Sequence, residues 1–162
     1  MSRKEEILTD LLNARQQILS TAARVPAEKQ DEIFLGVWSL KDLLAHLIGW
    51  DYSNVEAVKD ILSGSSPAVF QHWNPDWSAY NARLVKEYKL DDFTEMMECI
   101  QGSHQGLIDT LHTIPAEEFE KDFGIRSPSG AKITVAWYLQ FEIDDEEQHY
   151  QQVENWLAET NA

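Results

Sequence analysis

The chain has 162 residues and a formal net charge of −15, from 28 acidic and 13 basic side chains. A charge of this sign repels phosphate backbones and anionic lipid surfaces, so we expect no nucleic-acid partner and no membrane partner. A neutral or cationic small molecule is easier to bind, and the length suits one domain over residues 1–162.

The cysteine content and the first residues bear on the location of the protein. Cys99 is the only cysteine, so an internal disulfide is impossible, which fits a reducing compartment. Residues 1–6 lack the apolar core of a signal peptide, and no stretch is long and apolar enough to span a membrane. We therefore expect a cytoplasmic protein.

The first predicted element is a helix over residues 2–25. Ser2 and Glu5 have the spacing of a capping box, in which each side chain accepts a hydrogen bond from the other residue's backbone. Pro26 ends the helical pattern because its ring cannot continue a helix. Apolar residues recur at intervals near 3.6 and form one stripe: Ile7, Leu11, Ile18, Ala22 and Val25.

The second predicted helix begins after Ser39, a favourable N-cap, with Asp42 near the positive end of the helix dipole. It ends before the stretch of Gly64, two serines and Pro67. More than twenty residues is a length typical of a four-helix bundle. Its buried side is predicted to carry Leu43, Leu47, Trp50, Asn54, Val58 and Ile61.

An aromatic-rich connection follows over residues 67–88. Its polar and aromatic residues are His72, Trp73, Trp77, Tyr80 and Asn81. Pro75 is predicted to start a short helix that runs to Tyr88. A connection of this length suits a crossover along the bundle, because antiparallel neighbours need only short loops.

Two further long helices complete the expected fold. The third begins at Asp91 or Asp92 and ends at Pro115, and an irregular stretch over residues 116–131 separates it from the last, over residues 133–159. No strand pattern of useful length is present. The sequence therefore predicts an all-α four-helix bundle.

Polar residues on the apolar stripes indicate a metal site. His46 borders the buried side of the second helix, and Asp145 and His149 are four residues apart, so they share one face of the last helix. Two imidazoles and a carboxylate can hold zinc, nickel, iron or manganese. Three protein ligands leave positions open for water and substrate, as in catalytic metal sites.

A second interpretation of these residues needs no metal. His46 can be a hydrogen-bonded core residue, and the acidic run around Asp145 can be a solvated helix face. In a metal-free enzyme, Asp51, Asp145 or Glu142 would position or deprotonate a water molecule, while tryptophans hold an apolar substrate.

The chain resembles the ClbS/DfsB family of the DinB-like superfamily. The resemblance rests on four motifs in order: Trp38-Ser39-x-Lys41-Asp42-x-x-x-His46-Leu47-Ile48-x-Trp50-Asp51, then Trp77-x-x-Tyr80-Asn81, then Thr134-x-x-x-Tyr138, then His149-Tyr150 with Trp156. It implies an up-down-down-up bundle with a long crossover between the second and third long helices. Many DinB-like proteins bind a metal through a histidine on the second helix and a His-x-x-x-His pair on the fourth, which correspond here to His46, Asp145 and His149. Asp145 replaces the first histidine of that pair.

The resemblance also implies small-molecule chemistry. The ClbS/DfsB family includes a resistance protein that opens a reactive cyclopropane in a genotoxin, without necessarily using a metal. We therefore expect a hydrolase or detoxification-type protein with a pocket between the second and fourth long helices. The candidate catalytic residues are Asp51 and Glu142, and the candidate pocket residues are Trp50, Trp77, Asn81 and Tyr138. The alternative is a non-catalytic ligand-binding bundle or structural homodimer with a degenerate metal site.

Overall fold

The computed structural model describes residues 1–73 and 77–160. Its α-helices are α1 (Arg3–Ala23), α2 (Leu40–Leu62), α3 (Ser78–Tyr88), α4 (Phe93–His112) and α5 (Val135–Thr160), and three 3-10 turns are η1 (Ala27–Lys29), η2 (Ala68–His72) and η3 (Ala116–Glu118). Within the described residues, extended pairing is limited to two isolated bridges, Leu35 with Trp38 and Arg126 with Lys132. The predicted all-α bundle is confirmed.

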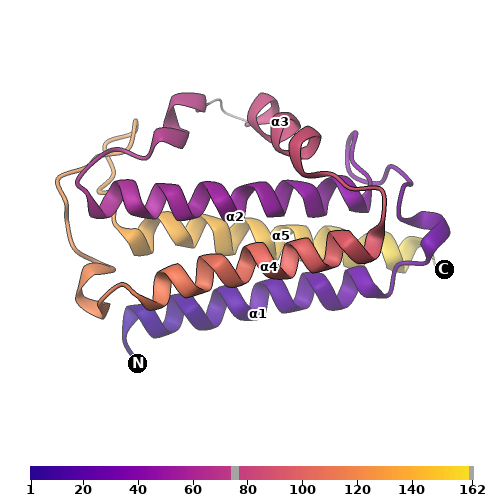
Figure 1. Ribbon diagram of the computed structural model, residues 1–162, viewed down its shortest axis with the longest axis horizontal. Helices are drawn as coiled ribbons and strands as arrows, with labels where there is room; N and C mark the ends of the chain where they lie inside the picture. Colours follow the sequence, from indigo (N-terminus) through magenta and orange to yellow (C-terminus); the bar gives the residue numbers. More distant parts are fainter. Residues whose placement is uncertain (74–76, 161–162) are drawn as a thin grey trace.

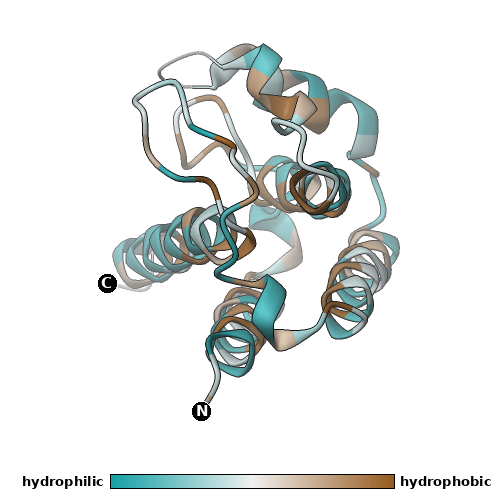
Figure 2. Ribbon diagram, turned by 90° about the vertical axis from the view of Figure 1, so that its left-hand side faces the viewer, coloured by the Kyte–Doolittle hydropathy of each residue, from teal (hydrophilic) through white to brown (hydrophobic). Residues whose placement is uncertain are grey.

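Four long helices lie side by side, with α1 and α5 running one way and α2 and α4 the other (Figure 1). Helix α1 packs chiefly against α5, and α2 packs against α4. Because α2 and α4 point the same way, the chain must return along the bundle between them. This crossover carries η2 and α3 over the outer side of α2, outside the four long helices (Figure 2).

Side-chain caps fix where the helices begin. Ser2 and Glu5 form the predicted capping box of α1, and Ser39 and Asp42 form one at the start of α2. Asp92 is the N-cap of α4 and accepts a hydrogen bond from the backbone of Glu95. Pro75, which we expected to start the short helix, lies outside the described residues.

Helix α3 approaches α2 closely at a glycine. A Cβ atom added to Gly49 would lie 2.8 Å from Cβ of Leu84, a distance that real side chains do not tolerate. The absence of a side chain at Gly49 therefore lets α3 lie against α2. Trp77 caps α3 in the left-handed region, with φ of 55°.

The core has two apolar halves separated by a polar layer. One half contains Leu11, Leu107 and Ile143, and the other contains Ile18 and Ile100. Between these two halves each long helix contributes buried polar side chains, which are Arg15, Asp51, Asn54, Ser103, His104, Glu142, Glu146 and His149. No helix of the described chain is long and apolar enough to cross a membrane.

Candidate functional site

A buried ion cluster forms the centre of the polar layer. Arg15 donates two hydrogen bonds of 2.8 Å to the oxygens of Asp51, and its Nη2 also lies 2.5 Å from Oε1 of Glu146. Their side chains are at most 2% exposed. The Ser103 hydroxyl donates to Oδ2 of Asp51 at 2.6 Å. The cluster thus joins α1, α2, α4 and α5.

The charges in this cluster stabilise one another. Burial opposes the charge of Arg15, but Glu146 and Asp51 raise its pKa well above the usual value. Burial likewise favours the neutral form of Asp51, yet Arg15 lowers the pKa of that carboxyl. Asp51, a predicted catalytic residue, therefore has both oxygens engaged, and it is not part of the pocket lining.

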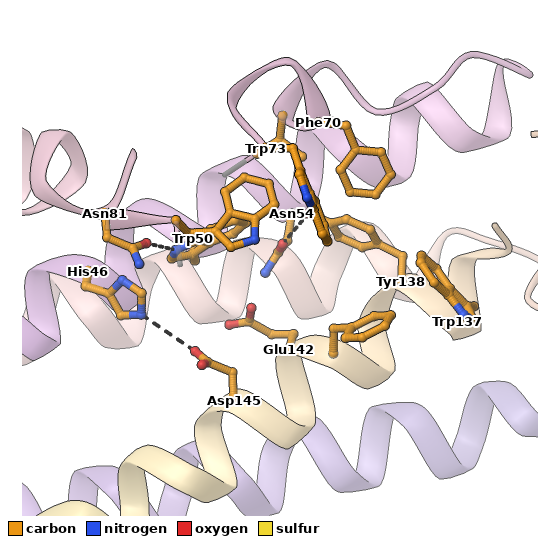
Figure 3. A pocket seen from close by; sticks show the side chains of 13 residues that line it. His46, Trp50, Asn54, Phe70, Trp73, Asn81, Trp137, Tyr138, Glu142 and Asp145 are labelled. Carbon is orange, nitrogen blue, oxygen red and sulfur yellow. Dashed lines mark hydrogen bonds and ion pairs between the residues drawn. The ribbon is translucent and has the colours of Figure 1, made fainter. Parts of the chain in front are cut away.

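A pocket of about 290 Å³ opens next to the polar layer, between α2, α5 and the crossover (Figure 3). The four predicted pocket residues, Trp50, Trp77, Asn81 and Tyr138, all line it. The other lining residues are His46, Asn54, Val69, Phe70, Trp73, Trp137, Phe141, Glu142 and Asp145. We did not assign Trp137 and Phe141 from the sequence, although their four-residue spacing places them on one face of α5.

Hydrogen bonds hold several polar groups of the pocket wall in place. Trp50 donates its indole N–H to Oδ1 of Asn81 at 2.8 Å, which ties α2 to α3. Tyr138 donates its hydroxyl to Oδ1 of Asn54 at 2.8 Å, which ties α5 to α2. Both bonds are drawn in Figure 3. They fix the orientation of two aromatic rings that face the cavity.

Glu142 is the buried carboxyl of the pocket. Its side chain points from α5 toward α2 (Figure 3), the residue is 7% exposed, and Oε1 has no hydrogen-bond partner among the described residues. Burial, followed by the charges of Glu146, Asp145 and Asp51, raises its pKa well above the usual value, although the nearby Asn54 amide acts in the opposite direction. This environment favours the neutral acid, which can donate a proton.

His46, Asp145 and His149 converge at the end of the pocket. Oδ2 of Asp145 lies 3.2 Å from Nε2 of His149 and 3.6 Å from Nε2 of His46. One candidate ligand atom from each of the three residues lies within 4.8 Å of the other two. His149 also contacts Oε1 of Gln152 through Nδ1, at 2.7 Å. The helical spacing of the sequence thus corresponds to a real cluster.

Burial and the carboxylate of Asp145 together determine the protonation of the two histidines. Burial lowers the pKa of His46. Burial acts in the same direction on His149, but its hydrogen bond with Asp145 raises the net pKa. Although burial favours the neutral form of Asp145, the two histidines hold its pKa well below the usual range. Near neutral pH, His46 is therefore the uncharged imidazole and Asp145 the carboxylate.

The cluster fits a divalent metal ion. Among the described residues neither ring nitrogen of the buried His46 has a hydrogen-bond partner, which is a costly state that a metal bond would relieve at one of the two nitrogens. Gln152 would orient His149 from behind, as outer partners of metal-bound histidines do. Asp51, His104 and Glu146 form a second close group, but Arg15 already supplies the positive charge there.

A sequence profile of the DinB superfamily matches residues 10–153, so the chain belongs to that superfamily. No curated protein matches it. Three solved structures share its fold, each with a TM-score of 0.77. An uncharacterised protein of Escherichia coli UTI89 is 15% identical, and the match covers 98% of this chain and 94% of that one. The colibactin self-resistance protein ClbS, in complex with dsDNA, is 14% identical over 94% of this chain and 93% of its own, and DfsB, described as a sibling lethal factor precursor, is 14% identical over 99% of this chain and 97% of its own. Two of them, ClbS and DfsB, are the proteins after which the family suggested by the sequence motifs is named.

One of these structures overturns a prediction from composition. We expected no nucleic-acid partner because of the charge of −15, but ClbS, a protein of this fold, is crystallised with double-stranded DNA. The prediction was wrong because net charge is a sum over the whole molecule. The potential that DNA meets depends on where the charges lie on one face, and on non-ionic contacts.

Proposed function

We propose that the protein acts on a small organic molecule in the pocket between α2 and α5, with hydrolytic or detoxification-type chemistry. The observation that carries this proposal is Glu142, a buried carboxyl inside an aromatic-lined cavity, with one oxygen that no described residue pairs. A strongly perturbed acid in a concave, mostly apolar pocket is the usual signature of a reactive site. The single cysteine, Cys99, supports the proposed cytoplasmic location.

In this proposal Glu142 is the general acid. It holds a proton near neutral pH and gives it to the substrate atom that gains charge as a bond breaks. His46 is uncharged and lines the same pocket, and its ring nitrogens accept or donate no hydrogen bond within the described part of the chain, so without an ion it can accept a proton from an attacking water molecule. An acid with a raised pKa and a base with a lowered one suit these two roles.

The proposed metal ligands are His46, Asp145 and His149, for zinc, nickel, iron or manganese. A bound ion would lower the pKa of a water molecule and polarise a substrate oxygen. His46 would then be a ligand instead of a base, while Glu142 would remain the proton donor. Asp51 is assigned to the support of the bundle through Arg15.

A substrate screen tests this function. The panel contains esters, amides, epoxides, strained-ring electrophiles and, because of the ClbS complex, a short DNA duplex. We expect turnover that Glu142→Gln lowers by about 10²–10⁴-fold, the usual contribution of a general acid. Each assay is run with EDTA and with added zinc, using His46→Ala and the exposed control His112→Ala.

The variants separate the readings of the site. Loss of zinc binding in His46→Ala with retention in His112→Ala supports the metal site. Turnover that resists EDTA but needs His46 supports the metal-free form. Turnover that Glu142→Gln leaves unchanged would remove the proposed acid, and folded protein without turnover on any member would favour the non-catalytic ligand-binding bundle.

A further inference from the structure

The pocket wall is built mainly of aromatic rings. They are Trp50, Phe70, Trp73, Trp77, Trp137, Tyr138 and Phe141, and the lining contains no lysine or arginine among the described residues. Trp77 stands nearly perpendicular to both Trp50 and Trp73, at interplanar angles of 74° and 75°. Neighbouring rings therefore form adjoining walls instead of a stack. Ring faces are negative, so such walls attract a cation.

The polar end of the pocket is rich in carboxyl groups. Glu142 and Asp145 line the cavity, and Asp51 and Glu146 lie behind them in the polar layer. Arg15 is the only arginine or lysine in contact with this group in the described chain, and it pairs with Asp51 and Glu146. Glu142 is more than nine-tenths buried and no group of the described residues donates to its Oε1, so the pocket contains an acceptor that these residues leave unpaired.

We propose that the pocket binds an organic cation, a small amine or quaternary ammonium on an apolar body, with its charge held by the tryptophan faces and by the partial negative charge of the unpaired Oε1 of Glu142. Tryptophan is the strongest aromatic partner of a cation, and aromatic cages are the usual receptors of quaternary ammonium groups. An anionic ligand would meet the carboxyls directly, and a neutral one would gain no electrostatic attraction from the ring faces. This inference rests on the proposed function, because it names the class of molecule for the same pocket.

Electrostatics at Glu142 agrees with this assignment. After burial, the largest influences on its pKa are three other carboxylates, all of which disfavour its ionised form. The position therefore lies at negative potential, which a bound cation would offset. The cavity of about 290 Å³ is large enough for a small ammonium compound with a modest apolar group.

A matched pair of ligands isolates the charge. Choline and 3,3-dimethylbutan-1-ol have nearly the same shape and differ by the positive nitrogen. We expect choline to bind about tenfold more tightly, measured by calorimetric titration and by shifts of the indole N–H signals in NMR spectra. Titrations with EDTA and with zinc show whether an ion at His46, Asp145 and His149 adds positive charge and weakens choline binding.

Three variants locate the binding site. Glu142→Gln keeps the size of the side chain and replaces the carboxyl by an amide, and Trp73→Leu removes an aromatic face at the pocket rim, where Trp73 is 53% exposed. We expect each to weaken choline binding by about threefold or more. Tyr52→Leu is the control, because Tyr52 is 51% exposed, stacks on Tyr88 and does not line the pocket. Its choline affinity should equal that of the parent.

The outcomes separate this inference from the proposed function. Equal affinity for choline and the neutral alcohol, or choline binding that Tyr52→Leu weakens as much as Trp73→Leu, would overturn the cation assignment. If choline fails to bind while the substrate screen gives Glu142-dependent turnover, only the cation assignment falls. If choline binds with the expected discrimination but no substrate is turned over, the cation site stands and the catalytic function does not.

Discussion

Glu142 is buried where a charge is unfavourable on every side. Its carboxyl lies near Asp145 and Glu146 on its own helix and near Asp51 on α2. A folded-state pKa above the unfolded value means that the folded protein binds this proton more tightly. Folding stability is then lost as pH rises above the unfolded pKa of about 4.3 and through the folded pKa.

Glu142→Gln should therefore stabilise the protein, but only at pH values above the unfolded pKa of Glu142, where the parent loses stability through this group. At pH 8 we expect a free energy of unfolding about 1–2 kcal/mol higher than in the parent, because the amide carries no charge into the buried site. Near pH 3 the two proteins should be equally stable, since Glu142 of the parent is then neutral in both the folded and the unfolded state. Urea unfolding across this pH range measures the difference.

Glu147→Gln is the control for this comparison, because Glu147 is exposed on the same helix. Its effect on stability should be small at every pH. A stabilisation by Glu142→Gln that did not change with pH would mean that packing, and not ionisation, sets the difference.

Single residues also mark the limit of what the sequence predicted. The spacing of Asp145 and His149 correctly placed them together, and the pairing with His46 followed from two facing helices. Glu146 belongs to the same acidic run and looked solvated, yet it is fully buried. The missing signal was Arg15, which occupies an apolar-stripe position of α1 between Leu11 and Ile18. A cation at such a position needs a buried carboxylate, but the sequence does not say from which helix.

At the scale of elements, local chemistry determined most of the fold. Capping residues and prolines set the ends of α1, α2 and α4 to within a few residues of their predicted positions. The position of α3 depends instead on contacts with α2, which lie far from it in sequence. The sequence pattern could predict that an aromatic crossover exists, but not that Leu84 of α3 packs against Gly49 of α2.

Gly49→Ala should displace α3. Alanine favours a helix interior by about 1 kcal/mol, but its Cβ would overlap Leu84, and overpacking typically costs about 1–3 kcal/mol. We expect a net loss of stability of about 1 kcal/mol, together with weaker ligand binding, because α3 carries Asn81 and follows Trp77. Thermal unfolding and the choline titration measure the two effects.

Gly106→Ala on α4 provides the matched comparison. Nothing lies within 4 Å of a Cβ atom added there, so the same substitution should stabilise the protein by about 0.5–1 kcal/mol and leave ligand binding intact. If Gly49→Ala were also stabilising, the close contact between α2 and α3 would be easily relaxed.

At the scale of the whole molecule, the polar layer unites the bundle. Arg15 of α1 holds Asp51 of α2 and Glu146 of α5, and Ser103 of α4 completes the connection. A buried layer of charged groups stabilises a protein less than an apolar layer of the same volume, because transferring its charges out of water costs free energy. Removing one partner is more serious, since it leaves the other charges buried and unpaired.

Arg15→Met should lower the free energy of unfolding by about 3–5 kcal/mol at pH 7, as expected when one partner of a buried ion cluster is lost. Without the cation the pKa of Asp51 is no longer lowered by Arg15, so the penalty applies above the unfolded pKa of this carboxyl and fades as pH falls toward 4. Denaturant unfolding at several pH values follows this change.

The triple variant Arg15→Met with Asp51→Asn and Glu146→Gln tests the cause. It removes all three charges at nearly constant volume, so it should recover a large part of the stability lost by Arg15→Met alone. A triple variant that is less stable than the single one would show that the hydrogen-bond geometry matters more than the charges.

The pairing of the first long helix with the last has a consequence for biosynthesis. Helix α1 is synthesised before α2, α4 and its chief partner, α5, and Arg15 needs a carboxylate on α5. The apolar stripe of α1 therefore lacks its chief packing partner while more than a hundred further residues are synthesised. Closure of the bundle is a late event, and during translation the nascent chain exposes the surface that chaperones recognise.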